Sequence, residues 1–527
     1  MPISRTIPEL LKEQAEKYSK REAIVAGTQR LSYCALRQEV RQVAKGLMAL
    51  GIQRGDHVGI LMGNRLEWVL AFLAVQQLGA TSVGLNTWAT PREMEYALAH
   101  AEITCLIAVD QFQRNNYRAM IEGMQPRSSV LPRLRHTVWV AAKALTVPAA
   151  HGEMSWDAMV CMGKDIPDER VDAAGRKVEA DDIAVLLYTS GSTGAPKGIL
   201  LQHGKWIQNA FEIGERQKVT HTDRLWLAVS LFWSFGCVNA MPNLLTHGGC
   251  IALQEHFDPA EALSLIERER CTIMYGTPNM VQVLVEHPDR VRRDLSSLRS
   301  GAMIGTPEQL MSAVNLGATQ ICNVYGLSET YGNCAVVDAN EPLEVRLQSV
   351  GKPLPGVILR ICHIKTGDPV SVGEVGEIRT KGPLFSAYYK DEEKTRETFD
   401  TEGFFCTGDL GTLDDEGRLY YRGRLKEMVK SGGINIAPIE VEETLMRHPA
   451  VRSAYVIGVP DPLLDEILAA IVILNSEALV TADELKQFCK KELAAYKVPK
   501  RFRFATDAEL PLTTTGKLQK MKLKSLL

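Results

Sequence analysis

The first half of the chain alternates amphipathic helices with short apolar strands. Two helix starts match the capping box, at Thr6-Ile7-Pro8-Glu9 and at Thr90-Pro91-Arg92-Glu93. Further helices are expected over residues 33–50 and 66–78, and strands over 57–61, 81–85 and 104–109. This alternation predicts βαβ units, whose strands form a largely parallel sheet covered by helices on both faces.

The remainder of the chain divides into three regions. Residues 180–330 repeat the pattern and predict a second wound sheet, with strands near 183–187, 225–229, 249–253, 272–275 and 320–324. From about 334 to 422 the strands are short and separated by Gly, Pro and Asp turns, which indicates a small β-barrel or sandwich. A compact α+β unit is expected to follow, with strands at 454–459 and 467–474 and a helix at 482–495.

Composition favours a globular protein that binds small molecules. Hydrophobic residues make up 45% and charged residues 23% of the 527 residues, and the net charge of −3 disfavours a nucleic-acid binder. The eleven cysteines form no C-x-x-C pair, which predicts buried thiols without disulfides in a reducing compartment. The N-terminus lacks the apolar core of a signal peptide, and glutamines interrupt the longest apolar stretch, 68–84. We therefore expect no transmembrane segment and a cytoplasmic location.

A run of hydroxyl-bearing residues and glycines ending in a lysine, residues 188–198, directly follows the apolar residues 183–187. Glycines let backbone N–H groups approach an oligophosphate, hydroxyls add donors, and Lys197 adds a positive charge. A Walker loop needs Gly before and Ser or Thr after its lysine, whereas Pro196 and Gly198 flank Lys197, and the G-x-S-x-G spacing of a nucleophile elbow is missing too. The run predicts a phosphate-binding loop, although a flexible Ser/Gly linker would have the same composition.

Four more segments combine small or rigid backbone with one or two polar side chains. They are residues 325–330, the expected turn at 407–409, residues 423–433 and residues 511–517. Each has an ordinary explanation when taken singly: Asp409 would cap its turn, Tyr325 would lie in the core, and Lys517 would be a surface charge. Their shared order along the chain favours one joint function.

With these motifs in this order, the whole chain resembles the adenylate-forming superfamily, which holds acyl-CoA synthetases, peptide-synthetase adenylation domains and firefly luciferase. The segment Arg424-Leu425-Lys426-Glu427-Met428-Val429-Lys430 is most similar to the branch of 4-coumarate and fatty acid CoA ligases. The resemblance implies an α/β fold: a large N-terminal domain over 1–423, with two wound subdomains and a small β-barrel, and a smaller, mobile α+β domain over 424–527.

The resemblance also implies a role for each motif residue. The loop from Thr189 to Lys197 would hold the β- and γ-phosphates of ATP, Tyr325 would stack on adenine, Ser328 would meet the α-phosphate, and Glu329 would ligate Mg²⁺. Asp409 would accept hydrogen bonds from both ribose hydroxyls, and Arg424 would touch ribose or phosphate. The full set of implied ATP- or AMP-binding residues is Thr189, Ser190, Gly191, Ser192, Thr193, Gly194, Lys197, Gly301, Ala302, Tyr325, Gly326, Ser328, Asp409 and Arg424.

Two half-reactions follow from the same resemblance. Lys517 would bridge the acid's carboxylate and the α-phosphate while acyl-AMP forms and pyrophosphate leaves. The C-terminal domain would then rotate about the hinge residue Lys426 so that CoA can take the acyl group. Gly432 and Gly433 would line the path of the pantetheine arm, and Lys430 matches a lysine used in this second conformation.

The acid pocket is expected to be uncharged. Its walls would come from residues 226–240, 272–283, 301–306 and 321–337, whose one Asp, Glu, Lys or Arg side chain is Glu329. This predicts an uncharged, mostly apolar acid, with fatty, aryl, alicyclic and steroid-type acids all open. The pocket residues would be Trp233, Asn239, Thr277, Met303 and Tyr331. The sequence departs from the branch at Ser230-Leu231-Phe232-Trp233 and Gly301-Ala302-Met303-Ile304, and Trp233 would either restrict the acid tunnel or fill core space.

The expected activity is ATP-dependent ligation of such an acid to CoA, with ATP and CoA as co-substrates and Mg²⁺ as cofactor. The main alternative is an acyl-AMP ligase that loads a carrier protein, which usually carries an insertion that is not seen here. A luciferase-like oxygenase and a regulator with a relic ATP site are also considered, the latter disfavoured because Lys517 and Glu329 are both present. The sequence leaves the oligomeric state open, a homodimer included.

Overall fold

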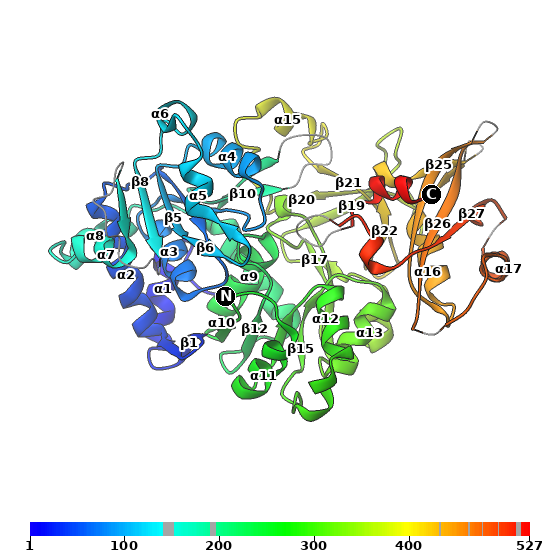
Figure 1. Cartoon of the computed structure of the whole chain (residues 1–527), viewed down its shortest axis with the longest axis horizontal. Coiled ribbons are helices and arrows are strands. Elements are labelled where there is room, and N and C mark those ends of the chain that lie inside the picture. Colours follow the sequence, from blue (N-terminus) through cyan, green and yellow to red (C-terminus); the bar gives the residue numbers. More distant parts are fainter. Residues whose placement is uncertain are drawn as a thin grey trace. The chain divides into compact units, whose positions relative to one another are not determined.

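The computed structural model describes residues 1–140, 152–189, 196–431, 434–461, 464–476, 478–493, 495–512 and 518–527 (Figure 1). These residues divide into two compact units. The N-terminal unit comprises Met1–Ile358 and Lys381–Gly403, and the C-terminal unit comprises Leu359–Thr380 and Phe404–Leu527. The predicted boundary between 423 and 424 lies inside the C-terminal unit, and it stays a prediction.

The N-terminal unit contains a seven-stranded sheet in the order β11-β10-β4-β3-β5-β8-β9. Its strands are β3 (His57–Leu61), β4 (Thr81–Gly84), β5 (Cys105–Val109), β8 (His136–Val140), β9 (Glu153–Ser155), β10 (Ile183–Thr189) and β11 (Lys197–Gln202). All neighbours are parallel except β10 and β11, which form an antiparallel hairpin. The predicted strands at 57–61, 81–85 and 104–109 are confirmed.

A second sheet of the same unit has nine strands in the order β18-β17-β16-β15-β14-β12-β13-β1-β2. They are β1 (Glu22–Ala26), β2 (Gln29–Ser32), β12 (Arg224–Leu227), β13 (Cys250–Leu253), β14 (Ile273–Tyr275), β15 (Ser300–Met303), β16 (Gln320–Tyr325), β17 (Ala335–Val336) and β18 (Lys352–Pro353). Neighbours from β1 to β16 are parallel, while β2, β17 and β18 add antiparallel edges.

Each sheet contains a strand that its position in the sequence would assign to the other sheet. The strand predicted at 183–187 to begin the second sheet is β10, which pairs with β4 of the first, while β1 pairs with β13 of the second. Neighbouring strands are selected by pairing and by burial of their apolar faces, so sequence order alone does not assign a strand to a sheet. The strand β15 was not predicted, because Ser300 and Gly301 interrupt its apolar pattern.

Helices cover both sheets. They include α1 (Ile7–Lys17), α2 (Tyr33–Ala49), α3 (Leu66–Gln77), α4 (Pro91–His100), α5 (Tyr117–Glu122), α6 (Arg127–Val130), α7 (Trp156–Met162), α8 (Asp168–Gly175), α9 (His203–Gln217), α10 (Met241–His247), α11 (Pro259–Glu269), α12 (Pro278–Glu286), α13 (Pro307–Leu316), α14 (Leu343–Gln348) and α15 (Glu392–Glu397). The capping box predicted at Thr90 is complete, whereas Thr6 accepts a hydrogen bond from Glu9 N–H without the full box. Helix α9 packs against strands of both sheets, β11 of the first and β15 and β16 of the second.

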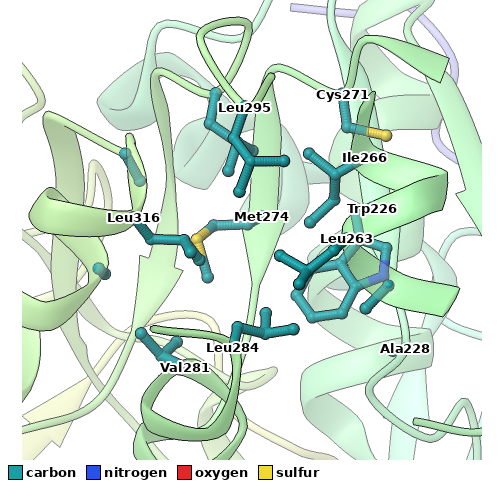
Figure 2. Close-up of a cluster of buried hydrophobic side chains, with 14 of the residues drawn as sticks. Trp226, Ala228, Leu263, Ile266, Cys271, Met274, Val281, Leu284, Leu295 and Leu316 are labelled. Atoms are coloured by element: carbon teal, nitrogen blue, oxygen red, sulfur yellow. The ribbon is translucent and has the colours of Figure 1, made fainter. Parts of the chain in front are cut away.

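A hydrophobic core lies between the second sheet and helices α11, α12 and α13 (Figure 2). Trp226 on β12 and Met274 on β14 face Leu263 and Ile266 of α11 and Leu284 of α12. All five side chains are fully buried, so they contribute to holding the parallel strands that lead into the candidate site.

The C-terminal unit contains two further sheets. The first has the order β19-β20-β21-β22, with β19 (Ile358–Cys362), β20 (Gly376–Lys381), β21 (Phe405–Leu413) and β22 (Leu419–Arg424). The second consists of β23 (Val429–Ser431), β24 (Ile434–Ile436), β25 (Val451–Asp461), β26 (Asp465–Leu474) and β27 (Arg501–Phe504), with helices α16 (Pro438–Met446) and α17 (Ala482–Glu492). The predicted α+β character of the chain's end is confirmed.

The region 334–422 does not form one separate β unit. Its strands β17 and β18 extend the nine-stranded sheet, because Val324 and Tyr325 of β16 offer them a free edge for antiparallel pairing. Among the described residues, the later strands form an open row of four.

Eight of the eleven cysteines are buried, Cys34 and Cys406 are half-buried, and Cys161 is exposed. Burial raises the pKa of the Cys105, Cys250 and Cys322 thiols to about 12. In the described parts of the chain, every helix falls short of the length or the apolar character that crossing a bilayer requires.

Candidate functional site

The predicted phosphate loop begins and ends in one β-hairpin. Tyr188 pairs with Gly198, and Thr189 pairs with Lys197, in the antiparallel register of β10 and β11. The predicted loop residues Ser190, Gly191, Ser192, Thr193 and Gly194 lie outside the described residues. The two ends of the loop are therefore held at neighbouring positions of the hairpin, with the lysine at the start of β11.

Aromatic side chains support both ends of this loop. The His100 ring nitrogen Nδ1 lies 2.7 Å from the Tyr188 hydroxyl, and the Tyr96 hydroxyl donates a 3.3 Å hydrogen bond to the carbonyl of Pro196. The Tyr96 ring stacks on His100. Burial raises the pKa of Tyr188 and lowers that of His100, so both groups are neutral at physiological pH. This neutral frame leaves Lys197 as the charged group at the hairpin.

Glu329 and Lys197 meet at the same tyrosine. Tyr388 donates a 2.8 Å hydrogen bond from its hydroxyl to Glu329 Oε1, and Lys197 Nζ lies 5.0 Å from the centre of the Tyr388 ring. Burial raises the pKa of Tyr388, and the Glu329 carboxylate raises it further. The structure thus brings together the predicted phosphate-binding lysine and the predicted metal-binding carboxylate. The sequence interpretation did not include Tyr388, because the segment around it carried no phosphate-loop or turn motif.

The segment after β16 places the next predicted residues beside a helix of unusual geometry. Glu329 and Ser328 belong to the 3₁₀-helix Ser328–Thr330, and the Ser328 hydroxyl donates a 3.1 Å hydrogen bond to Ser234. Ser234 begins the π-helix Ser234–Ala240, a form often found at functional sites. Tyr325 is the last residue of β16 and is buried. Its predicted stacking on adenine stays a prediction.

Close backbone approach explains two of the predicted glycines. A Cβ on Gly301, at φ +142°, would lie 1.9 Å from the Met274 carbonyl oxygen, and one on Gly326 would lie 2.4 Å from the Cα of Asn333. Ala302 is buried in β15 next to Gly301. These contacts account for small residues at these positions through packing, so binding of AMP by Gly301, Ala302 and Gly326 stays a prediction.

Trp233 belongs to a cluster of three aromatic side chains. Its ring centre lies 5.2 Å from that of Trp88 and 5.5 Å from that of Phe232, and Trp88 and Phe232 are also 5.2 Å apart. Trp88 follows β4 of the seven-stranded sheet, whereas Phe232 and Trp233 follow β12 of the nine-stranded sheet. The cluster therefore joins one connecting segment of each sheet. Trp233 and Trp88 are half-buried and Phe232 is buried. Trp233 is therefore held in place by its neighbours on one side and partly exposed on another.

The other predicted pocket residues differ in burial and in hydrogen bonding. Asn239 lies in the π-helix and is fully buried, and neither polar atom of its side chain is hydrogen-bonded to a described residue. Tyr331 is fully buried, and its hydroxyl accepts a 2.9 Å hydrogen bond from Gln202 N–H. Thr277 caps α12 through a hydrogen bond from Met280 N–H. Met303 is part of the core cluster around Trp226. A role of these residues in acid binding stays a prediction, and among them Asn239 is the one whose side-chain nitrogen and oxygen both lack a hydrogen-bond partner in the described part of the chain.

In the C-terminal unit, Asp409 and Arg424 lie opposite each other on β21 and β22. Arg424 Nε is 3.3 Å from Asp409 Oδ1, and Asp409 is 5% exposed. Burial alone would lower the pKa of Arg424, but Asp409 and Tyr421 raise it. The expected turn at 407–409 is instead a bulge inside the continuous strand β21, where Gly408 has φ +69° and the register to β20 shifts.

Of the five residues predicted for the hinge, the CoA path and the catalytic lysines of the C-terminal domain, two lie in the described part of the chain. Lys426 lies in the 3₁₀-helix Leu425–Glu427, and Lys430 lies in β23, paired in the backbone register with Asn435. Gly432, Gly433 and Lys517 lie outside the described residues. Leu512 and Leu518, on either side of the segment that carries Lys517, pair with each other in an antiparallel bridge.

The donor set fits a magnesium ion bound together with a nucleotide. In the part of the chain that the structure describes, no group of three or more His, Cys, Asp or Glu side chains is arranged to hold a metal ion. Mg²⁺ usually keeps several waters and binds through one or two carboxylates plus substrate phosphates. Glu329, with one oxygen oriented by Tyr388, suits such a site.

Comparison with known proteins matches the chain over nearly its whole length. The family model of the AMP-binding enzymes covers residues 11–389, and that of the AMP-binding enzyme C-terminal domain covers residues 440–517. The candidate acyl-CoA synthetase YngI of Bacillus subtilis (strain 168) is 34% identical over an alignment of 539 positions, which covers 99% of this chain and 97% of YngI. The mitochondrial medium-chain acyl-CoA ligase ACSF2 of Mus musculus is 31% identical over 99% of this chain and 87% of its own.

Solved structures agree with the fold. The anthranilate CoA ligase AuaEII in complex with anthranoyl-AMP has a TM-score of 0.86 and 28% identity, covering 100% of this chain and 98% of that chain. ATP-bound MatB from Rhodopseudomonas palustris has a TM-score of 0.84 and 27% identity, covering 98% of both chains. The predicted α/β fold, with a large N-terminal and a small C-terminal domain, is confirmed. The chain therefore belongs to the AMP-binding enzyme family, as an AMP-forming acyl-CoA ligase of the adenylate-forming superfamily.

Proposed function

We propose that the protein activates an uncharged, mostly apolar carboxylic acid as its acyl-AMP and then transfers the acyl group to CoA. The observation that carries this proposal is the meeting of Lys197 and Glu329 at Tyr388, directly beside the hairpin of the phosphate loop. A cationic group and a metal-binding carboxylate at one loop suit a triphosphate whose outer phosphates leave together.

ATP would be held by groups from both ends of the loop and from the β16 segment. The loop from Thr189 to Lys197 would bind the β- and γ-phosphates, Ser328 would meet the α-phosphate, and Tyr325 would stack on adenine. The short distance between Asp409 and Arg424 supports a role of this pair in binding the ribose hydroxyls and the neighbouring phosphate. When bound at Glu329, Mg²⁺ would offset part of the negative charge of the phosphates.

In the first half-reaction, an oxygen of the acid's carboxylate attacks the α-phosphorus. The bond from the α-phosphorus to the bridging oxygen of the β-phosphate breaks, and pyrophosphate leaves. Both reactants are anions, so a cation between them is needed as negative charge builds, and Lys517 is the residue we assign to this task. Lys197 would stay with the departing pyrophosphate.

In the second half-reaction, the thiolate of CoA attacks the acyl carbon and AMP leaves with the bonding electron pair. Rotation about Lys426 would first remove Lys517 from the acyl-AMP and bring Lys430 towards it. Gly432 and Gly433 would let the pantetheine arm pass close to the backbone. The short 3₁₀-helix Leu425–Glu427 between β22 and β23 supports such a rotation, since 3₁₀ turns often occur at hinges.

The nature of the acid follows from the charge of its candidate walls. Among residues 226–240, 272–283, 301–306 and 321–337, the one acidic or basic side chain is Glu329, which is engaged with Tyr388. A free amino group or a second carboxylate on the acid would be buried there without a partner, which is costly. The side chain of Asn239, which has no hydrogen-bond partner among the described residues, would hydrogen-bond one neutral polar substituent of the acid.

The decisive experiment measures pyrophosphate release with a panel of acids. Fatty, aryl and alicyclic acids are compared with an α-amino acid and a dicarboxylate, each with ATP and Mg²⁺. We expect release with at least one uncharged class and none with the charged acids. Release with the charged acids alone would contradict the acid assignment, and acyl transfer to a carrier protein in place of CoA would favour a carrier-loading ligase. The proposed cytoplasmic location is tested separately by fractionation, since ACSF2 is named as mitochondrial.

A further inference from the structure

Three segments of the C-terminal unit meet at the side chain of Lys520. Lys520 Nζ lies 2.7 Å from Glu442 Oε1 and 3.5 Å from Glu427 Oε2. Glu427 ends the 3₁₀-helix Leu425–Glu427, Glu442 lies in α16, and Lys520 begins the C-terminal 3₁₀-helix Lys520–Leu526. One lysine therefore links the end of the chain to a helix and to the segment that follows β22.

This ion-pair cluster is largely removed from solvent. The exposed fractions of the side chains are 19% for Lys520, 10% for Glu442 and 26% for Glu427. Burial raises the pKa of Glu442, whose Oε1 also accepts a 2.7 Å hydrogen bond from Val456 N–H. Burial alone would lower the pKa of Lys520, but the two carboxylates raise it, so the lysine stays charged at neutral pH. Removing the lysine would leave the carboxylates of Glu427 and Glu442 close together without a positive charge to balance them.

Two members of the cluster are close in sequence to positions that matter for the proposed reaction. Lys520 follows Lys517 by three residues, and Glu427 directly follows Lys426. Lys520 also lines a cavity of about 80 Å³ together with Lys426, Glu427 and Lys524. On the other side, Leu523 is fully buried and packs with Ile457 and Ile471 of the sheet, which anchors the C-terminal helix. Residues 518–527, which follow Lys517 in the sequence, are thus attached both to the sheet and to the hinge segment.

We infer that Lys520 is a positioning residue, which ties the segment carrying Lys517 to the hinge through Glu427, so that a rotation at Lys426 carries Lys517 with a fixed geometry. This inference rests on the proposed function. Glu442 acts as the buried anchor of the lysine, and Glu427 connects it to the moving segment. A purely structural role of the cluster would instead affect stability and leave the two half-reactions equally active.

Four variants separate these explanations. Lys520→Met removes the charge, Lys520→Arg keeps it, and Glu427→Gln breaks only the link to the hinge. Lys497→Met is the matched control, because Lys497 Nζ pairs with Glu440 Oε1 of the same helix α16 at 2.6 Å and has no ion pair with the described residues of the hinge segment. Thermal stability, ATP–pyrophosphate exchange, and thioester formation from supplied acyl-AMP are measured for each full-length variant.

The inference predicts a selective loss in the first half-reaction. Lys520→Met and Glu427→Gln should each lower kcat of ATP–pyrophosphate exchange by about tenfold, as expected for a small displacement of a reacting group, and change thioester formation less than about twofold. A further protein that combines Lys520→Met with Glu427→Gln should be no worse than Lys520→Met alone, because both changes break the same link. Lys520→Arg should retain most of the exchange activity, and Lys497→Met should retain all of it.

A readout independent of activity accompanies the kinetics. Amide hydrogen exchange over residues 424–431 and 518–527 should become faster in Lys520→Met and Glu427→Gln but not in Lys497→Met. The inference is overturned if the rate of ATP–pyrophosphate exchange follows the melting temperature in all four variants. It is also overturned if the rates of both half-reactions fall by the same factor. Absence of pyrophosphate exchange in the unmodified protein with every acid would instead refute the proposed function, and unchanged amide protection in Lys520→Met would refute the link itself.

Discussion

Tyr388 donates a hydrogen bond of 2.8 Å to Glu329 while its ring lies under the ammonium group of Lys197, 5.0 Å from the ring centre. The tyrosine thus orients a carboxylate and faces a cation at the same time. Its backbone pairs with Ile199 of β11, so the position of the ring is tied to the hairpin of the phosphate loop. A single side chain therefore connects two groups that lie more than a hundred residues apart in the sequence.

Replacing Tyr388 by Phe should weaken magnesium-dependent ATP binding. The variant keeps the ring but removes the hydroxyl that donates to Glu329, and outer partners of this kind typically contribute about ten- to a hundredfold to metal affinity or activity. We expect an increase of about tenfold in the Mg²⁺ concentration needed for half-maximal ATP binding, measured by calorimetry. The matched control is Tyr389→Phe, whose hydroxyl donates to Glu102 at 3.1 Å. Equal behaviour of the two variants would contradict the assignment.

Replacing Lys517 by Ala should separate the half-reactions. Loss of one preorganised cation near the reacting phosphate costs about 3–4 kcal/mol, or a hundredfold or more in the rate of acyl-AMP formation. Supplied acyl-AMP should still be converted to the thioester. Lys522→Ala, at an exposed position of the same C-terminal segment, serves as the control. If both half-reactions fell by the same factor in Lys517→Ala, the division of labour between the two conformations would be wrong.

Replacing Trp233 by Ala should change the choice of acid if its ring borders the pocket. The variant removes one side of the cluster with Trp88 and Phe232 and frees space for a larger acyl group. Pocket contacts of one or two methylenes discriminate by about tenfold, so the ratio of kcat/KM between long and short acids should rise by about that factor. Phe211→Ala, a half-buried ring stacked on His247, controls for the loss of an aromatic side chain. A loss of stability with an unchanged acid profile would show that Trp233 only fills the core.

The stability of the protein should fall in mild acid because of His203. Burial lowers the pKa of His203 to about 4, and its Nδ1 accepts a hydrogen bond from Ile7 N–H at 3.4 Å. The unfolded chain binds a proton near pH 6.5 and the folded protein does not until about pH 4. The contribution of His203 is therefore intact above pH 6.5 and lost as the pH falls towards 4, by roughly 3 kcal/mol in total.

Urea unfolding between pH 7 and pH 4.5 tests this prediction. The decline in unfolding free energy should be shallower in His203→Gln than in the unmodified protein, and unchanged in His221→Gln, which alters an exposed histidine. Carboxylates contribute equally to all three proteins, so the difference isolates His203. Parallel curves for the unmodified protein and His203→Gln would refute it.

The sequence predicted most elements but not their assembly. The capping signal at Thr90 and the apolar run before Tyr188 are local features, so they identified α4 and β10. Which sheet accepts β10 depends on pairing with β4, a partner a hundred residues earlier, and no local pattern encodes that choice. The same holds for Tyr388, because its function arises from contact with Glu329 and Lys197.

The segment Thr407-Gly408-Asp409 illustrates a different limit. Its composition correctly indicated an irregular backbone, since Gly408 has a positive φ. The flanking strand residues nevertheless keep pairing with β20 and β22, so the irregularity is a bulge within one strand. Thr407 stabilises it by donating a 2.6 Å hydrogen bond to the Ile378 carbonyl. Turn propensity is a property of a few residues, whereas continuation of a strand depends on its neighbours.

The distribution of the cysteines makes this protein convenient to label with a spectroscopic probe. Thiolates rather than thiols react with maleimides, and the buried thiols with pKa values near 12 carry almost no thiolate at neutral pH. Cys161, on the surface of α7, is therefore the natural attachment point for a first fluorophore in the N-terminal unit. A second probe, introduced at one exposed position of the C-terminal unit, would report the distance between the units during turnover without any change to the core.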